Sequence, residues 1–273
     1  MILMTASKPS DIEQTRYSLT IEQFLEGGLL VPLFQPIVSL GNEAVYGYEG
    51  TIRGPVGSHL QSPLELLDTA AAAGLREQLE LACCRCQIEE FLRLGLPGKL
   101  FLNLSSGALI RANKHEREML ESTLFTSGIH PSQLVVELTE SSADSDLDSL
   151  RGVVAESRQM GIGFALDNFG TAQSNLRMWM ELRPEIVKID RYFVNGLHAD
   201  RTRLETVKLI LRQAETFGTL AIAEGIEEQA DLDTLKGLGV QFGHGYLIGR
   251  PSPAPHRPHN VYVAPARRVV EAV

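Results

Sequence analysis

The chain has 273 residues, a length that favours one large α/β barrel over a small module. Its 25 basic and 34 acidic residues give a net charge of −9, which argues against DNA or RNA binding because such proteins need a positive surface. No apolar run approaches the ~20 residues of a membrane span, so we expect no membrane insertion. The three cysteines are clustered and odd in number, which argues against a disulfide framework and indicates the reducing cytoplasm.

The cysteines form the sequence Cys83-Cys84-x-Cys86 within residues 75–94, where apolar residues recur at helical spacing. A zinc site would need a second Cys or His pair at ligand spacing, and none follows. We therefore interpret these cysteines as small buried residues of a helix rather than as metal ligands.

Strand-like and helix-like segments alternate along most of the chain. Residues 1–19 are polar and without pattern, and we expect a flexible N-terminal arm there. Helices are predicted after the capping-box residues Thr20 and Gln23, after Ser62-Pro63, and over residues 75–94, 144–160, 201–217 and 227–238. Strands are predicted over residues 30–40, 43–53, 99–105, 133–139, 163–167, 185–190, 219–224 and 239–248.

Eight strands that alternate with helices predict a single α/β domain, a closed (β/α)8 barrel over residues 20–252. The turn residues Gly41-Asn42 join the first two strands as a hairpin, so these two strands should be antiparallel, which an ordinary (β/α)8 barrel does not contain. Prolines at positions 253, 255, 258 and 265 predict an irregular C-terminal extension over residues 253–273.

Polar residues recur near the end of successive predicted strands. They are Glu49, Asn103, Glu137, Asp167, Lys188, Asp190 and Glu224. In a barrel the carboxyl ends of the strands meet at one mouth, where these side chains would share a pocket. Oxygen ligands select hard cations such as Mg²⁺ or Mn²⁺, which would also offset the repulsion between carboxylates. Each residue taken singly could be a solvated loop residue or a helix cap, so the pattern leaves both interpretations open.

Eight short motifs occur in order along the chain. They are Gln35-Pro36-Ile37, Glu49-x-x-x-Arg53, Asn103-x-Ser105, Glu137-Leu138-Thr139-Glu140, Asp167-x-Phe169-Gly170-Thr171, Lys188-Ile189-Asp190, Ala223-Glu224-Gly225-x-Glu227 and Gly245-Tyr246-Leu247-x-Gly249-Arg250-Pro251. With these motifs the chain resembles the EAL domain, a bacterial module that hydrolyses cyclic di-GMP to linear pGpG. The resemblance implies a modified TIM (β/α)8 barrel with an antiparallel first strand, which accounts for the hairpin.

The resemblance also implies roles for individual residues. Two divalent cations, Mg²⁺ or Mn²⁺, would be held by Glu49, Asn103, Glu137, Asp167, Asn168 and Glu224. The catalytic residues would be Glu49, Asp167 and Lys188, the last of which activates or holds the attacking water. The residues on the substrate side would be Gln35 at a guanine edge, Arg53 at a phosphate, Asp190, Glu227 and His244. Glu140 would anchor the loop that follows Asp167.

The chain departs from the family pattern at several motif positions. Gly50-Thr51 replaces the signature Ala-Leu, and Thr51 would weaken purine packing. Asn168 replaces the second Asp of an Asp-Asp pair, so we expect a weakened second metal site, low activity in Mg²⁺ and higher activity in Mn²⁺. Ala172 replaces a loop Gly. His244 stands in place of a Gln, where it could form a hydrogen bond, bind a metal or act only as a spacer.

Three functions remain open at this stage. The chain could be a metal-dependent cyclic di-GMP phosphodiesterase, a cyclic di-GMP receptor without turnover, or a protein-interaction module. Nucleotide turnover distinguishes the first from the other two, and nucleotide affinity distinguishes the second from the third. The resemblance also implies a homodimer, because the loop after Asp167 lies near a two-fold interface in many EAL proteins.

Overall fold

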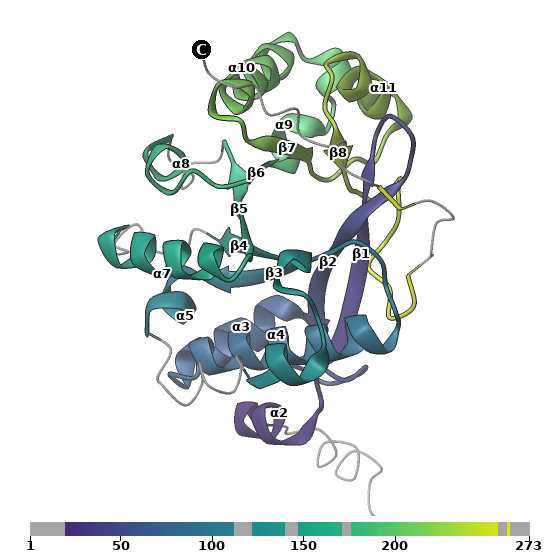
Figure 1. Ribbon diagram of the computed structural model, residues 1–273. Helices are drawn as coiled ribbons and strands as arrows, with labels where there is room; N and C mark the ends of the chain where they lie inside the picture. The colour runs from purple at the N-terminus through teal and green to yellow at the C-terminus, as the bar shows by residue number, and fades with distance from the viewer. Residues whose placement is uncertain (1–19, 112–121, 140–146, 171–175, 256–260, 263–273) are drawn as a thin grey trace, which may run out of the picture.

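The computed structural model of the chain describes residues 20–111, 122–139, 147–170, 176–255 and 261–262. Within them, eight strands form a closed barrel in chain order (Figure 1). The strands are β1 (Val31–Ser39), β2 (Val45–Arg53), β3 (Lys99–Ser105), β4 (Leu134–Thr139), β5 (Gly163–Phe169), β6 (Ile186–Ile189), β7 (Leu220–Ala223) and β8 (Phe242–Gly243). The predicted α/β barrel is therefore confirmed.

Strand β1 runs against the direction of the other seven. It pairs antiparallel with β2 on one side and with β8 on the other, whereas every pair from β2 to β8 is parallel. The expected antiparallel first strand is thus confirmed. Its reversal follows from the turn at residues 40–44, which is too short for the crossover that a parallel connection needs.

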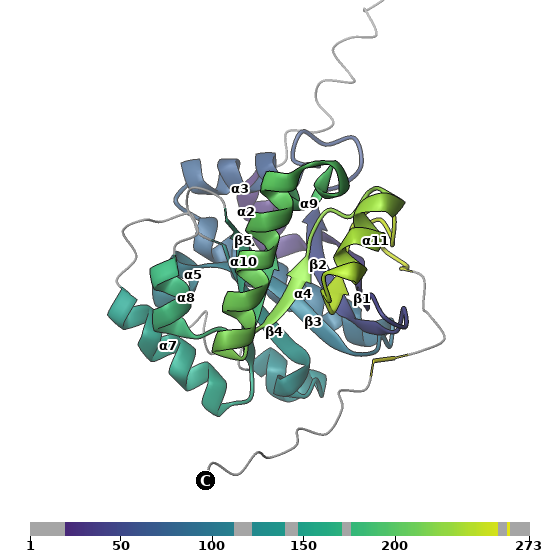
Figure 2. The same cartoon turned by 90° about the horizontal axis from the view of Figure 1, so that it is seen from above.

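Helices cover the outside of the barrel (Figure 2). The longer ones are α2 (Ile21–Gly27), α3 (Pro63–Ala72), α4 (Arg76–Arg93), α7 (Leu147–Gln159), α8 (Leu176–Leu182), α10 (Arg201–Phe217) and α11 (Gln229–Gly237). The shorter ones are α5 (Ser106–Arg111), α9 (Arg191–Val194) and the 3₁₀ turns Pro131–Gln133 and Leu197–Ala199. Among the described residues, no helix has both the length and the apolar character needed to cross a membrane.

Both faces of the strands are buried, which explains their continuous apolar character. In β3, Leu100, Leu102 and Leu104 face the helices. Phe101 faces the barrel interior, where it belongs to a cluster that we call the apolar layer. The apolar layer consists of Ile37, Tyr46, Phe101, Val135, Ala165, Ile186, Ile222 and Phe242, one residue from each strand. It closes the amino-terminal end of the barrel beneath the mouth.

The predicted element boundaries differ most at the last strand. Only Phe242–Gly243 of the predicted 239–248 segment pairs as a strand. Gly245 then approaches Ile226 so closely that a Cβ at this position would lie 2.1 Å from the Ile226 nitrogen. This tertiary contact turns the chain away from the sheet. By contrast, β3 and α10 begin and end where the sequence predicts.

The cysteines of α4 pack as predicted for small buried residues. Cys83 and Cys84 lie in hydrophobic clusters on the two sides of this helix. Burial raises the pKa of the Cys84 thiol to about 12, with Glu80 adding to the shift, so the thiolate that a metal needs is disfavoured.

Part of the C-terminal extension contacts the barrel. Val261 forms a parallel bridge with Val45, and the Tyr262 nitrogen donates to the Val45 carbonyl at 2.7 Å. The Tyr262 ring packs edge-on against Phe242 of the apolar layer. The predicted arm over residues 1–19 lies outside the described residues, and the division of the chain into arm, barrel and extension stays a prediction.

Candidate functional site

Lys188 on β6 is the centre of the site. Its ammonium contacts four carboxylates that come from four different parts of the barrel. The Nζ atom lies 2.7 Å from Glu137 Oε1, 2.7 Å from Glu224 Oε1, 3.2 Å from Glu49 Oε2 and 3.2 Å from Asp167 Oδ1. Lys188 is 1% exposed and Glu137 is 0% exposed. The structure therefore brings together the four predicted carboxylates and the predicted lysine.

The two-residue period of the strands positions these side chains. Alternate residues of a strand face the same side, so each residue two positions after a member of the apolar layer faces the interior one level higher. This relation holds for Asn103, Glu137, Asp167, Lys188, Glu224 and His244. Glu49 joins them because it is paired with Gln35 across the hairpin. We call these seven residues the charged layer.

Two irregularities adjust which side chains reach the charged layer. Tyr46 has no partner between the pairs Ile37–Gly47 and Val38–Val45, and this bulge offsets Glu49 from the strict two-residue period of β2. On β5 the register shifts between Leu166 and Phe169, and Asn168 has a φ of +51°. Asn tolerates this left-handed backbone conformation, and the shift allows Asp167 and Asn168, although adjacent, to line the same pocket.

The buried charges change each other's protonation. Burial raises the pKa of Glu137 well above its usual range, and the neighbouring Glu49 and Asp167 add to this although Lys188 opposes it. Burial and the charges of Glu224 and Glu49 likewise raise the pKa of Asp167 to about 7, against the effect of Lys188. Burial opposes ionisation of Glu224 too, but Lys188 and His244 outweigh it and lower its pKa to about 2. The positive charge of Lys188 is thus insufficient to keep the pKa values of Glu137 and Asp167 in their usual range.

The charged layer fits a divalent cation. Four carboxylates facing one ammonium carry three excess negative charges when all are ionised. Glu137 Oε2 is buried and makes no hydrogen bond with the described residues. Oxygen donors in this number and charge are the ligand set of Mg²⁺ and Mn²⁺. Such an ion would supply the positive charge that Lys188 alone does not.

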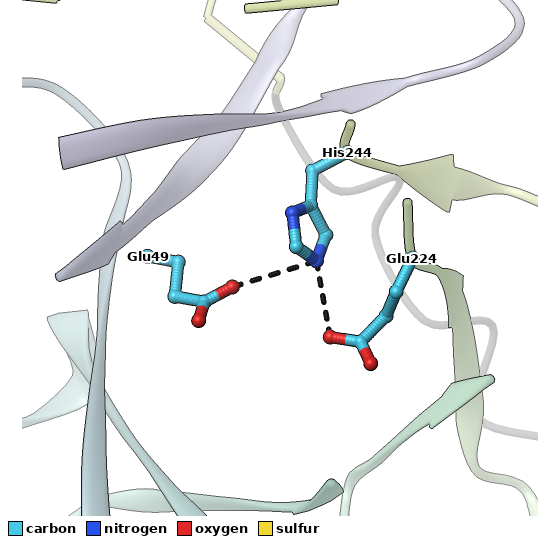
Figure 3. Close-up of side chains that lie close together, drawn as sticks. All are labelled: Glu49, Glu224 and His244. Carbon is cyan, nitrogen blue, oxygen red and sulfur yellow. Dashed lines mark hydrogen bonds and ion pairs between the residues drawn. The ribbon is translucent and has the colours of Figure 1, made fainter. Parts of the chain in front are cut away.

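His244 follows β8 and contacts two of the four carboxylates. Its Nε2 atom lies 3.1 Å from Glu224 Oε1 and 3.4 Å from Glu49 Oε2 (Figure 3). The residue is 6% exposed. The sequence analysis assigns His244 to the substrate side, and the structure places its ring against the carboxylates.

A pocket of about 410 Å³ lies over the charged layer. Predicted residues on its wall are Gln35, Glu49, Asp167, Asn168, Asp190, Glu224, Glu227 and His244. The Gln35 Nε2 donates to the Gly249 carbonyl at 2.9 Å, which fixes the amide. Asp190 caps α9 by accepting from the Tyr192 nitrogen at 2.7 Å.

Among the described residues, four predicted site residues do not line the pocket, namely Lys188, Glu137, Arg53 and Asn103. Arg53 donates to the carbonyl of its neighbour Ile52 at 2.8 Å and does not line the pocket. Asn103 is at the floor, where its Nδ2 makes a long 3.5 Å contact with Glu49 Oε1. Glu140 lies outside the described residues, as does the loop over residues 171–175 that it was expected to anchor.

Four residues to which the sequence analysis gave no site role also line the pocket, namely Gly225, Gly245, Arg191 and Tyr246. Arg191 brings a positive charge to an otherwise acidic wall. Because it follows Asp190 directly at the end of a predicted strand, its place at the pocket could have been predicted from the sequence. Tyr246 is 51% exposed and is covered on one face by the Arg250 guanidinium, 4.2 Å from the ring centroid. Its place in the Gly245-Tyr246 motif could likewise have predicted a position at the pocket.

The comparison with protein families matches residues 19–251 to the EAL domain. The chain belongs to the EAL domain family. Among curated relatives, the bifunctional diguanylate cyclase/cyclic di-GMP phosphodiesterase MucR of Pseudomonas aeruginosa is 32% identical over 253 residues, 89% of this chain and 36% of MucR. The probable cyclic di-GMP phosphodiesterase PdeB of Escherichia coli is 31% identical over 225 residues, 81% of this chain and 42% of PdeB.

Solved EAL structures share the fold. The PaMucR phosphodiesterase in complex with c-di-GMP has a TM-score of 0.75 at 31% identity, and the match covers 86% of this chain and 96% of that one. Klebsiella pneumoniae BlrP1 in a manganese/cy-diGMP complex has a TM-score of 0.75 at 28% identity, covering 83% of this chain and 57% of that one. The chain spans about a third of the length of the curated relatives it matches.

Gly50, at which the sequence analysis expects a departure from the family pattern, lies in a position where packing leaves little space for a side chain. A Cβ on Gly50 would lie 3.0 Å from the Gln87 side chain of α4, which is 4% exposed. Gly50 therefore accommodates a buried glutamine directly behind Glu49. Thr51 lowers the stability at this point, because its Oγ1 is buried and makes no hydrogen bond with the described residues.

Proposed function

We propose that this EAL domain is a metal-dependent phosphodiesterase that hydrolyses cyclic di-GMP to linear pGpG. The observation that carries the proposal is the fully buried Lys188, surrounded by four carboxylates at the floor of an open pocket. Burying these charges is costly, and a chain that only packs a barrel has no need of them. The relatives named as cyclic di-GMP phosphodiesterases supply the substrate class.

Glu49, Asn103, Glu137, Asp167, Asn168 and Glu224 would together hold two divalent ions, the second of them more weakly because Asn168 is neutral. Such ions, Mg²⁺ or Mn²⁺, would supply positive charge against the phosphate and would increase the acidity of water. Glu137 and Asp167 fit this role because their pKa values are raised, so a cation would favour their ionised forms.

In the reaction a water oxygen would form a bond to phosphorus and lose a proton, one P–O bond to a ribose would break, and the released ribose oxygen would take up a proton. Lys188 would donate a hydrogen bond to the attacking water and keep Glu49 and Asp167 oriented. Gln35 and Arg191 on the pocket wall are suited to a guanine edge and a phosphate, respectively. Asp190 and Glu227 would position the substrate from the same wall.

A receptor without turnover is the second candidate, and Asn168 is the observation that favours it. Its Nδ2 donates to Asp167 Oδ2 at 2.7 Å, so a neutral amide occupies the place where most EAL domains add a carboxylate. The second ion would then be held by fewer charges.

Turnover of cyclic di-GMP by the purified chain in Mg²⁺, in Mn²⁺, in Ca²⁺ and in EDTA tests the proposal. We expect linear pGpG to accumulate faster in Mn²⁺ than in Mg²⁺ and not at all in EDTA. Absence of product in every cation, together with tight nucleotide binding measured by calorimetry, would replace the phosphodiesterase with the receptor. Absence of both would leave the protein-interaction module.

We also propose a homodimer in the cytoplasm. The dimer is supported by α8, which begins directly after residues 171–175 and exposes Leu176 (50%) and Met180 (56%). The cytoplasm is supported by three free cysteines, of which Cys83 and Cys84 are buried. Light scattering that gives only the mass of one chain at tens of micromolar protein, with and without nucleotide, would overturn the dimer.

A further inference from the structure

His244 is the feature of the charged layer that the proposed function leaves unused. It supplies the only ring nitrogen that faces the carboxylates among the described residues of the site. Glu49, Glu224 and His244 each offer one ligand atom, and the three atoms lie within 4.8 Å of one another (Figure 3). All three residues also line the pocket, and because both carboxylate oxygens contact the Lys188 ammonium as well, a cation bound here would share them with Lys188.

The distances match ligand atoms that share one ion. Two ligands bound at about 2.1 Å are separated by about 3.0 Å at a right angle and about 3.4 Å at a tetrahedral angle. The Nε2 atom of His244 is 3.1 Å from Glu224 Oε1 and 3.4 Å from Glu49 Oε2. One Nε2–H can donate well to only one of two oxygens, whereas a cation would satisfy the nitrogen and both oxygens together.

The backbone of His244 is fixed on both sides. Its nitrogen donates to the Ala223 carbonyl at 3.0 Å, and its carbonyl accepts from the Ile226 nitrogen at 3.1 Å. Gly245 allows this close approach, because a Cβ there would overlap Ile226. The Nδ1 atom is buried and makes no hydrogen bond with the described residues, so contacts at Nε2 alone orient the ring. The ring is therefore held with one nitrogen toward the two carboxylates.

We propose that His244 is a direct ligand of a divalent cation, with Glu49 and Glu224, and that it shifts the cation preference of this site from Mg²⁺ toward nitrogen-accepting ions such as Mn²⁺ and Co²⁺. The proposal rests on the metal-dependent function above. It assigns a role to a histidine that stands where EAL domains usually have a glutamine.

The chemical reason is the ligand type. Mg²⁺ is bound mainly by carboxylates, carbonyls and water, whereas imidazole suits transition metals, whose affinities increase from Mn²⁺ through Co²⁺ to Ni²⁺. A glutamine at this position could offer only an amide oxygen, which does not discriminate against Mg²⁺. Exchanging His244 for Gln should therefore change the ratio of affinities more than the affinity for Mg²⁺.

The described residues contain a second group of one histidine and two carboxylates, His198, Glu228 and Asp231, away from the pocket. Asp231 there accepts from the Gly196 nitrogen at 2.9 Å and from the His198 nitrogen at 3.0 Å, so its carboxylate is already used to anchor the segment before α10. His198 is thus a matched control, since the same His-to-Gln change can be made in a similar cluster.

The experiment measures binding of Co²⁺ and of Mg²⁺ to the full chain by calorimetry, and the electron spin echo of bound Mn²⁺, for wild type, His244→Gln and His198→Gln. We expect His244→Gln to lower the Co²⁺ affinity at least about tenfold and the Mg²⁺ affinity less than about threefold. The histidine nitrogen modulation of the Mn²⁺ echo should disappear in His244→Gln and remain in His198→Gln. Circular dichroism confirms that each variant is folded.

Equal Co²⁺-to-Mg²⁺ affinity ratios in wild type and His244→Gln would overturn the proposal, as would loss of the nitrogen modulation in His198→Gln alone. If His244→Gln does not fold, absence of nitrogen modulation in wild-type Mn²⁺ protein overturns it independently. Turnover is measured in parallel. If product forms but ion binding does not depend on His244, this inference is refuted and the proposed phosphodiesterase activity stands. If the nitrogen modulation is present but no product forms, the proposed activity is refuted and the assignment of His244 as a metal ligand stands.

Discussion

The apolar layer and the charged layer are built on the same strands, two residues apart, and they differ in almost every physical respect. Phe101 and Val135 in the lower layer are closely packed, and Tyr46 stacks on Phe242 with ring centroids 4.2 Å apart. One level higher, positions that are buried, or half-buried in the case of Glu49, hold four carboxylates, a lysine and a histidine. Burial of apolar side chains in the lower layer stabilises the fold, whereas burial of charges in the upper layer lowers this stability and creates a reactive site.

The largest expected effect separates activity from stability in the charged layer. Glu49→Gln keeps the side-chain volume but removes the charge that faces Lys188, so we expect turnover to fall by about 10²–10³-fold or more. The melting temperature should change by only a few degrees, because the side chain is 15% exposed and fills no core space. The exposed Glu65→Gln is the control, and a folded Glu49→Gln protein with wild-type turnover contradicts the assignment.

The opposite behaviour is expected in the apolar layer. Phe101 is 0% exposed, and Phe101→Ala should lower the free energy of unfolding by about 3–5 kcal/mol because it leaves a cavity inside the barrel. Urea denaturation measures this loss, and turnover of the protein that remains folded should stay near the wild-type value. Phe125→Ala, at a position 89% exposed, should cost little. Equal losses for the two variants would mean that the layers do not differ as described.

The stability of the protein should depend on pH because of the buried carboxylates in the charged layer. The pKa of Asp167 is about 7 in the folded protein against 3.8 for an unperturbed carboxyl, so the folded state binds this proton more tightly and loses stability as the pH rises from about 4 to 7. In EDTA, Asp167→Asn should therefore exceed wild type in stability by about 1–4 kcal/mol at pH 8, since one pKa unit corresponds to about 1.4 kcal/mol. The difference should nearly vanish at pH 4. A constant difference between chemical denaturation curves at the two pH values contradicts the prediction.

The smallest expected effect concerns Asn168. Asn168→Asp adds a carboxylate beside Asp167 and removes the hydrogen bond from its amide, so Mg²⁺ should half-saturate turnover at a several-fold lower concentration. Asn42→Asp is the control, because it adds the same charge in the exposed turn between β1 and β2. Equal half-saturation and equal maximal rates for wild type and Asn168→Asp would show that the neutral amide is an adequate ligand.

The sequence predicts the charged layer because polar residues interrupt otherwise apolar strands at a common end. Asn103 stands two residues after Phe101, and Glu137 stands two residues after Val135, so the strand period alone places them on the interior face. Barrel closure then brings the β2 residue Glu49 to the β6 residue Lys188, which are 139 positions apart. The presence of a shared site was therefore predictable, although no single contact was.

The remaining features depend on tertiary contacts that have no local signal. The end of β8 is set by the approach of Gly245 to Ile226, and the orientation of His244 follows from it. Arg53 belongs to a family motif, but its guanidinium is held by the Ile52 carbonyl rather than at the pocket. The short helix α9 was not predicted because four residues give no periodicity, although its cap Asp190 was noticed for another reason.

The reversal of β1 places the start of the barrel at the same end as the pocket. Val31, its first residue, pairs with Arg53 at the carboxyl end of β2, and α2 sits there, with its Phe24 ring 3.1 Å from the Cβ position of Gly54. In an all-parallel barrel the chain would enter at the opposite end. The chain therefore enters the barrel beside the mouth, where α2 ends at Gly27, eight positions before Gln35 on the pocket wall. The path from α2 along β1 to Gln35 thus runs on the pocket side of the barrel and does not cross it.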